Sequence, residues 1–167
     1  MARMVLGIDV GINGALACYD GTAVHILDVP TTGEDSKRRV NAAAVWPWLD
    51  QHKPVHAFIE YVNAMPAVAD ESGTRRSMGT ASAFRFGDTA GSLRTVVVCC
   101  GIPFRLVMAS KWKHHYGLIK TDKEASRQKA IDLLPAHANL FARKLDQNRA
   151  ESCLIAMYGW HELRKGT

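Results

Sequence analysis

The segment 4–9 constrains the fold most, because it places a carboxylate at the end of a short, nearly continuous apolar run. Such a run is typical of a strand in the middle of a sheet that is covered on both faces. Burying the Asp9 carboxylate there is costly without a charged partner. The glycines that follow, Gly11 and Gly14, allow another group to approach it closely. Taken by itself, an acid before a glycine-rich turn is most simply a turn residue. Whether Asp9 has a functional role therefore depends on residues later in the chain.

The rest of the chain predicts strands that alternate with helices. A hairpin is expected over 15–29 around Asp20-Gly21, and further strands over 55–62 and 103–109. Helices are expected over 41–51, 81–100, 121–134 and 148–163, with loops at 33–39 and over most of 63–79. This order predicts an α/β fold with a mixed five-stranded sheet.

Local signals suggest where two of these helices begin. Asn41 is a plausible N-cap of the first helix, and Pro47 should kink that helix or begin a shorter second one. Thr121 and Glu124 form a capping box at the start of the third helix. The last helix is apolar on most sides, so we expect it to be well buried.

Composition excludes several classes of protein. With 167 residues, 47% of them hydrophobic and 22% charged, residues 1–167 are expected to form a single globular domain. The longest apolar stretches, such as 96–100, are too short to cross a bilayer, and Asp9 interrupts the N-terminal apolar run, so no secretory signal is expected. The four cysteines lack metal or disulfide spacing, which indicates reduced thiols and a cytoplasmic protein.

Three further acids can be related to Asp9. Glu60 also ends an apolar run, and Asp146 and Glu151 lie at the start of the last helix. If the first strand lies beside the strand 55–62, Asp9 and Glu60 emerge together, and the last helix can bring its first turn to the same edge. Converging carboxylates repel one another unless cations neutralise them. Such a cluster suits Mg²⁺ or Mn²⁺, and two ions about 3.5–4 Å apart can support phosphodiester hydrolysis.

Each of these acids also has a plain structural interpretation. Glu151 stands three residues after Asn148, as in a capping box. Asp146 could be a turn residue, and Glu60 could pair with an arginine such as Arg75.

The basic residues are concentrated in one part of the chain. The segment 105–129 contains seven lysines and arginines against two acids, an excess equal to the whole net charge of +5. With Trp112 and Tyr116 inside it, the segment has the pattern of a surface that contacts phosphates. A solvated helix face is the alternative.

Four segments together resemble the RuvC-type Holliday junction resolvases. Residues 6–11 with Gly14, and then 58–62, resemble the first two catalytic segments of that family. Residues 86–91 and 101–103 resemble its glycine-bearing dimer helix and the strand after it. Residues 146–152 with Ile155-Ala156 resemble its closing acidic helix, and Ala64-Met65-Pro66 matches the phage and organelle branch.

This resemblance implies a ribonuclease H-like fold, with helices on both faces of the sheet. It further implies a homodimer that depends on Mg²⁺, with two ions per active site and no small-molecule cofactor. Mn²⁺ is also expected to support activity. Each subunit would cut one strand of a four-way DNA junction. A phage-encoded member would act in the cytoplasm of its bacterial host.

The family motifs identify two of the acids directly as metal ligands, but they leave a choice for the last pair. Asp9 and Glu60 carry over as metal ligands. Bacterial members place their last two ligands three residues apart, which here selects Asn148 and Glu151. Because Asn is a poorer Mg²⁺ ligand than a carboxylate, Asp146 with Glu151 is the favoured pair. These two are five residues apart on different helix faces, so Asp146 must precede the helix.

The resemblance also suggests the residues that contact DNA. Basic residues after the fifth strand, together with the arginines of the 63–79 segment, are expected to hold phosphates. They are Lys111, Lys113, Lys120, Lys123, Arg127, Arg75 and Arg76. The aromatic that engages junction bases in bacterial members corresponds to Asn63 here, and Tyr61 is the candidate to replace it.

The function expected from the sequence is therefore a structure-selective endonuclease that resolves four-way junctions by two-metal hydrolysis. Two alternatives stay open: a broader nuclease that also cuts flaps, forks and three-way junctions, and a non-catalytic protein that binds junctions. A kinase of the related actin-like fold is remote, because the chain is too short for the two domains of such enzymes.

Overall fold

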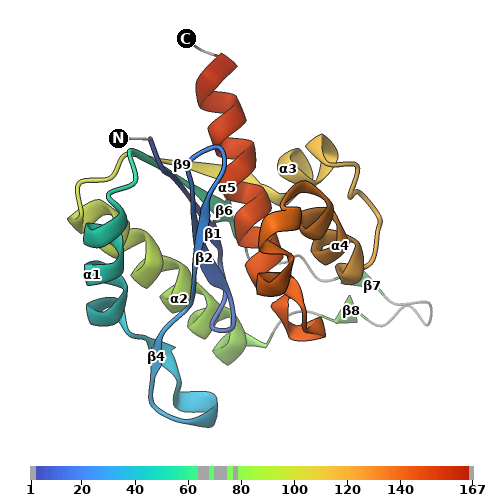
Figure 1. Cartoon of the computed structure of the whole chain (residues 1–167). Coiled ribbons are helices and arrows are strands. Elements are labelled where there is room, and N and C mark those ends of the chain that lie inside the picture. Colours follow the sequence, from blue (N-terminus) through green and yellow to red (C-terminus); the bar gives the residue numbers. More distant parts are fainter. Residues whose placement is uncertain (1–2, 64–67, 70–74, 77–78, 166–167) are drawn as a thin grey trace.

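A mixed sheet organises the computed structural model, which describes residues 3–63, 68–69, 75–76 and 79–165 (Figure 1). Within these residues the main sheet has five strands in the order β3-β2-β1-β6-β9. The strands are β1 (Val5–Asp9), β2 (Ala15–Tyr19), β3 (Val24–Asp28), β6 (His56–Tyr61) and β9 (Phe104–Met108). β1, β2 and β3 are antiparallel neighbours, whereas β6 is parallel to both β1 and β9. The predicted mixed sheet is confirmed.

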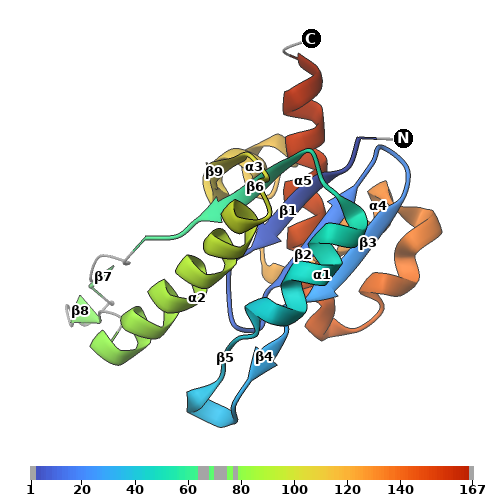
Figure 2. The same ribbon diagram turned by 90° about the vertical axis from the view of Figure 1, so that its left-hand side faces the viewer.

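Helices cover both faces of this sheet, as predicted. One face carries α1 (Ala42–His52) and α2 (Thr80–Cys99), and the other carries α5 (Gln147–Lys165), with α3 (Ala109–His115) and α4 (Lys123–Leu133) beside it (Figures 1 and 2). Short 3₁₀ helices are η1 (Asp35–Lys37), η2 (Pro135–Phe141) and η3 (Lys144–Asp146). Two-residue strands pair as β4 (Thr31–Thr32) with β5 (Arg39–Val40), and as β7 (Val68–Ala69) with β8 (Arg75–Arg76). None of the described helices is long and apolar enough to span a membrane.

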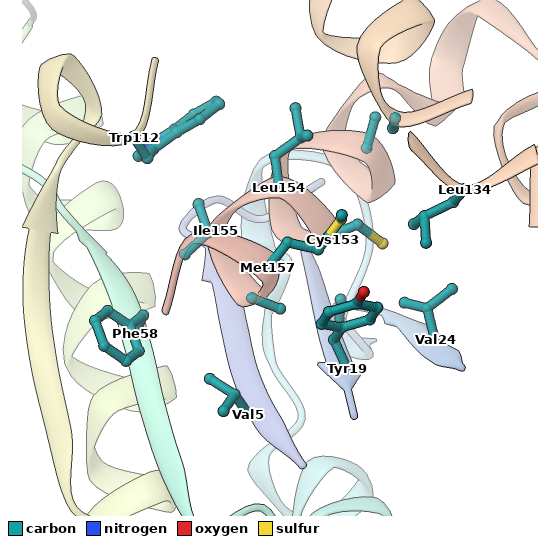
Figure 3. Packing of buried hydrophobic residues seen from close by; sticks show 14 of the residues in the cluster. Val5, Tyr19, Val24, Phe58, Trp112, Leu134, Cys153, Leu154, Ile155 and Met157 are labelled. Atoms are coloured by element: carbon teal, nitrogen blue, oxygen red, sulfur yellow. The ribbon is translucent and has the colours of Figure 1, made fainter. Parts of the chain in front are cut away.

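The side chains of β1 alternate between two hydrophobic cores. Val5 belongs to the core under α5, whereas Leu6 and Ile8 belong to the core under α1 and α2. Figure 3 shows the first core, where Val5 and Phe58 lie near the α5 side chains. Because strand side chains alternate with a period of two, Asp9 must share the face of Val5. The alternation therefore directs Asp9 towards α5.

Two glycines allow α5 to lie directly on the sheet. A Cβ on Gly7 would lie 2.3 Å from both the Ser152 oxygen and the Ala156 nitrogen of the α5 backbone, and one on Gly159 would lie 2.2 Å from the Phe58 ring. Real Cβ atoms do not approach so closely, so the missing side chains are what permit this packing. The contact at Gly7 places the first turns of α5 over the end of β1.

Three details of the fold differ from the sequence predictions. The β2–β3 connection has four residues, in which the Asp20 carboxylate accepts hydrogen bonds from the N–H groups of Thr22 (2.9 Å) and Ala23 (2.8 Å). Pro47 lies inside an α1 that runs unbroken, with the predicted Asn41 cap accepting from the Ala44 N–H. Burial of the α1 face that packs on the sheet overrides the cost of the proline.

The start of α4 was also predicted wrongly. Asp122 is its N-cap and accepts from the Ala125 N–H at 2.9 Å, while the Thr121 hydroxyl donates to the Leu118 carbonyl. A carboxylate is the stronger acceptor for the exposed N–H groups of a helix start. The sequence reading missed α3 entirely, because a seven-residue helix is too short to show clear periodicity.

Candidate functional site

The ends of β1 and β6 bring Asp9 and Glu60 together. The two strands are parallel with Ile8 opposite Ile59, so the next residues in register are Asp9 and Glu60. Glu60 has the parity of Phe58, which faces the α5 core, so both carboxylates lie on that face. Asp9 is only 8% exposed, and a hydrogen bond with its side chain lowers the pKa of Glu60.

Glu151 joins these two acids from α5. It directly precedes Ser152, the residue whose backbone touches Gly7. Its Oε1 accepts a hydrogen bond from the Ser126 hydroxyl of α4 at 3.1 Å and lies 3.4 Å from the Lys113 Nζ of α3. We refer to Asp9, Glu60 and Glu151 as the acidic cluster.

The acidic cluster is incompletely neutralised by its surroundings. Burial raises the pKa of Glu60, and the negative charge of Glu151 raises it further. The Trp112 indole opposes this by donating from Nε1 to Glu60 Oε1 at 3.2 Å, and the Lys113 charge also lowers the pKa. The pKa of Glu60 is raised overall, chiefly by burial, and a cation would favour its charged form.

Asp146 lies in a different environment. It ends η3, is 2% exposed and accepts from Arg143 at two points, the backbone N–H (2.8 Å) and Nη2 (2.7 Å). Burial tends to raise the pKa of Asp146, but the hydrogen bonds and charge of Arg143 outweigh it and leave the pKa below its ordinary value. Arg149 lies 3.7 Å away and also binds Asp28, with its Nε 2.7 Å from Oδ1.

The preference for Asp146 over Asn148 as the partner of Glu151 therefore needs correction. Both oxygens of Asp146 accept hydrogen bonds from Arg143, and the charges that lower its pKa are those of arginines. Asn148 instead shares a helix face with Glu151. Its Nδ2 donates to the backbone oxygen of Asn13 at 2.6 Å, in the turn that follows Asp9. Asn148 is thus hydrogen-bonded to the β1–β2 turn, whereas Asp146 is held by Arg143.

The donor chemistry of the acidic cluster fits a hard divalent cation. Carboxylate oxygens are the ligands that Mg²⁺ and Mn²⁺ take, and such an ion would offset the repulsion by Glu151 that adds to the effect of burial on the pKa of Glu60. Among the described residues, no three His, Cys, Asp or Glu side chains already form a group able to hold a metal. Trp112, Ser126 and Lys113 contact the oxygens of Glu60 and Glu151.

The predicted basic residues do not share one surface. Lys111 and Lys120 are exposed, whereas Lys113 sits at the acidic cluster. Arg127 pairs with Glu124 and donates to the Phe141 carbonyl at 2.6 Å, so it joins α4 to η2 instead of facing solvent. This is a second correction, and its reason is that these acceptors engage the guanidinium.

Some predicted contacts lie elsewhere or outside the described part. Tyr61 is 44% exposed, and strand alternation points it to the face of the sheet opposite Glu60. The side chains of Lys123, Arg75 and Arg76, and the whole of Ala64-Met65-Pro66, lie outside the described residues.

The sequence analysis did not assign Trp112 and Ser126 to the site. Trp112 is fully buried, and the Lys113 Nζ lies 5.0 Å from its ring centroid. Its position between two lysines, shortly after a predicted strand, could have indicated that it belongs to the site. Ser126 had no such signal, because its partner Glu151 is 25 residues away.

Comparison with known proteins places the chain by its structure. No family model and no curated protein matches it. The solved structure of T. thermophilus RuvC in complex with a Holliday junction substrate superposes with a TM-score of 0.65 at 18% identity, covering 99% of this chain and 98% of that one. A second Thermus thermophilus RuvC structure gives 0.56 at 17% identity, with the same coverage. The chain therefore has the ribonuclease H-like fold of RuvC, as its sequence motifs predicted.

Proposed function

We propose that this protein is an endonuclease that cuts four-way DNA junctions with the help of divalent cations. The observation that carries the proposal is the acidic cluster at the ends of β1 and β6, completed by α5. This cluster occurs in a fold shared with a RuvC that is bound to a Holliday junction substrate.

The acidic cluster would hold the ions. Mg²⁺ or Mn²⁺, as two ions per site, would supply an activated water and stabilise the leaving oxygen. Asp9 and Glu60 project from buried strands, so their positions are rigid, while Glu151 is oriented by Ser126. Asn148, on the same helix face as Glu151, is the candidate for a fourth, neutral oxygen ligand.

Lysines would bind the substrate beside this cluster. Lys113, already 3.4 Å from Glu151, can balance charge that develops on the scissile phosphate. Lys111 and Lys120 are exposed on the same side of the sheet and would contact the DNA backbone. Binding should therefore weaken steeply as salt rises.

A homodimer would supply the two cuts, one from each subunit. The outer face of α2 supports this: Phe84 and Val98 are 74% and 54% exposed, and nothing lies within 4 Å of a Cβ built on Gly87 or Gly91. Open glycines beside exposed apolar side chains would let a second helix approach closely.

Incubation with a labelled synthetic four-way junction and Mg²⁺ tests the proposal. We expect paired, symmetric nicks that yield ligatable duplexes, and a dimeric mass in solution. A parallel panel of flaps, forks, three-way junctions and linear duplex decides between a resolvase and a broader debranching nuclease. Intact junctions in both Mg²⁺ and Mn²⁺, with tight junction binding, would instead identify a non-catalytic binding protein.

A further inference from the structure

Two hollows include residues of the β1–β2 turn, which follows Asp9, and arginines line both of them. The first, of about 240 Å³, lies between η1 and α2 and is lined by Arg85 and Arg38. The second, of about 470 Å³, lies at the start of α5 and is lined by Arg38, Arg143 and Arg149. We refer to these four residues as the arginine track. The hollows share Arg38 and Ile12, so the track is continuous.

Arg38 is held at the junction of the two hollows by neutral groups. Its guanidinium donates to Asn13 Oδ1 at 2.9 Å, to the Ile12 carbonyl at 3.3 Å and to Thr31 Oγ1 at 3.3 Å. Within the described residues, no ion pair joins Arg38 or Arg85 to a carboxylate. Asp28 and Asp146 pair with Arg149 and Arg143 in the second hollow. Asp35 also lines the first hollow, so the two hollows hold four arginines against three carboxylates, a net charge of +1. Arg38 and Arg85 are the arginines of the track without a carboxylate partner among the described residues.

Both hollows include residues of the β1–β2 turn, which connects the arginine track to the end of β1 where Asp9 lies. The turn that contributes Ile12 follows Asp9, and Asn148, which lines the second hollow, shares a helix face with Glu151. The hollow also includes Val29, just after β3, whereas the lysines of α3 follow β9 at the other edge of the sheet. In Figure 1 the β1–β2 turn, β4 and the starts of α2 and α5 all lie at the lower end of the molecule.

We propose that the arginine track binds the sugar–phosphate backbone of DNA on the side of the cluster opposite the α3 lysines. A guanidinium fork matches phosphate oxygens in two-point contacts, and a concave surface with excess positive charge concentrates a polyanion. The substrate strand would then be held on both sides of the scissile phosphate. This inference rests on the proposed function insofar as it takes DNA as the ligand.

The test is the salt dependence of junction binding for Arg85→Gln, because within the described residues the Arg85 side chain makes no hydrogen bond or ion pair that the substitution would remove. Fluorescence anisotropy with a labelled four-way junction, in Ca²⁺ to prevent cleavage, gives the slope of log K against log salt concentration. We expect Arg85→Gln to reduce the slope by about 1, as for one lost phosphate contact. Lys53→Gln is the control: it removes one exposed positive charge at the end of α1, beside the start of β1 and therefore at the end of that strand away from Asp9. It should leave the slope unchanged.

Arg38 needs a paired design, because it also holds the β1–β2 turn. Arg38→Gln should reduce the slope by about 1, and Arg38→Lys, which keeps the charge, should largely restore it. Thermal unfolding of each variant shows whether the turn remains folded. An unchanged slope for both Arg85→Gln and Arg38→Gln would overturn the track, as would an equal loss in Lys53→Gln.

Failure of this inference and failure of the proposed function are distinguishable. Binding is measured without cleavage, so a protein that never cuts DNA could still show the reduced slopes. Conversely, junction cleavage with unchanged slopes would leave the nuclease proposal intact and remove the track. Repeating the series on linear duplex and on single strands shows which form of the backbone the track contacts.

Discussion

Two groups of acids near the start of α5 have opposite electrostatic surroundings. The buried Asp146 carboxylate pairs with Arg143, whose own side chain is largely exposed, and lies near Arg149. Burial alone would raise the pKa of Asp146, but the hydrogen bonds and charges of these arginines outweigh it and lower the pKa. Five residues later, Glu151 enters the acidic cluster, where burial and carboxylate repulsion raise the pKa of Glu60. The negative charge of the first group is balanced by arginines of the protein itself, so this group stabilises the fold. The negative charge of the second group is not fully balanced by the protein, and this favours the binding of a cation.

The largest expected effect is loss of cleavage on replacing a member of the acidic cluster. Asp9→Asn keeps the shape of the side chain but removes its charge, so we expect junction cleavage to fall about 1,000-fold, or ~4 kcal/mol of transition-state stabilisation. Junction binding in Ca²⁺ should persist. Cleavage rates with Mg²⁺ and anisotropy measure the two effects.

Asp146→Asn is the control that sharpens this comparison. It should retain most of the cleavage rate measured at a temperature where the variant is folded. A loss equal to that of Asp9→Asn, without loss of stability, would return Asp146 to the set of metal ligands.

Displacing α5 should disturb both groups of acids. In Gly7→Ala the new Cβ would overlap the α5 backbone at 2.3 Å, so we expect a loss of about 3 kcal/mol in the free energy of unfolding. Urea denaturation measures it. Gly87→Ala is the control, because a Cβ there meets nothing within 4 Å, and it should not destabilise the monomer. Equal stability of the two variants would contradict the close packing at Gly7.

Removing the charge of Asp146 should cost stability in a way that depends on pH. Asp146→Asn leaves Arg143 without its ionic partner, and we expect a loss in the free energy of unfolding at neutral pH that is smaller than that of Gly7→Ala, because solvent screens the exposed Arg143. Because the pKa of Asp146 is lowered in the folded state, its contribution is present above the unfolded value near 3.8 and disappears as pH falls through the folded pKa. The free energies of unfolding of the variant and the wild type, measured from neutral pH downward, should converge. A constant difference would contradict the ion pair.

The smallest expected effect has the opposite sign. Glu60→Gln removes a buried charge whose folded pKa is raised, so the variant should be more stable than the wild type by about 1 kcal/mol at neutral pH. The wild type loses stability as pH rises from about 4.5 through the folded pKa of Glu60, so the advantage should vanish in acid. Thermal unfolding in EDTA, from acid to neutral pH, measures the difference in stability between Glu60→Gln and the wild type. Destabilisation at neutral pH would show that the cluster is compensated after all.

Sequence patterns were sufficient for the sheet and for Asp9 and Glu60. A strand alternates its side chains with a period of two, so an acid at the end of an apolar run takes a predictable face. The glycine at position 7 and the apolar last helix were equally visible. These signals are local, and the structure reproduces each element within a few residues of its predicted bounds.

The partners of the remaining charged residues were not predictable in this way. Arg127 and Asp146 both looked like site residues, yet each is engaged by nearby groups in η2 and η3. Glu151 gains its role through Ser126 and Lys113, 25 and 38 residues earlier in the chain. The sequence by itself determined the elements and two carboxylates, because they follow from backbone periodicity. Only the tertiary structure decided which charges are compensated, because that depends on which side chains packing brings within hydrogen-bond distance.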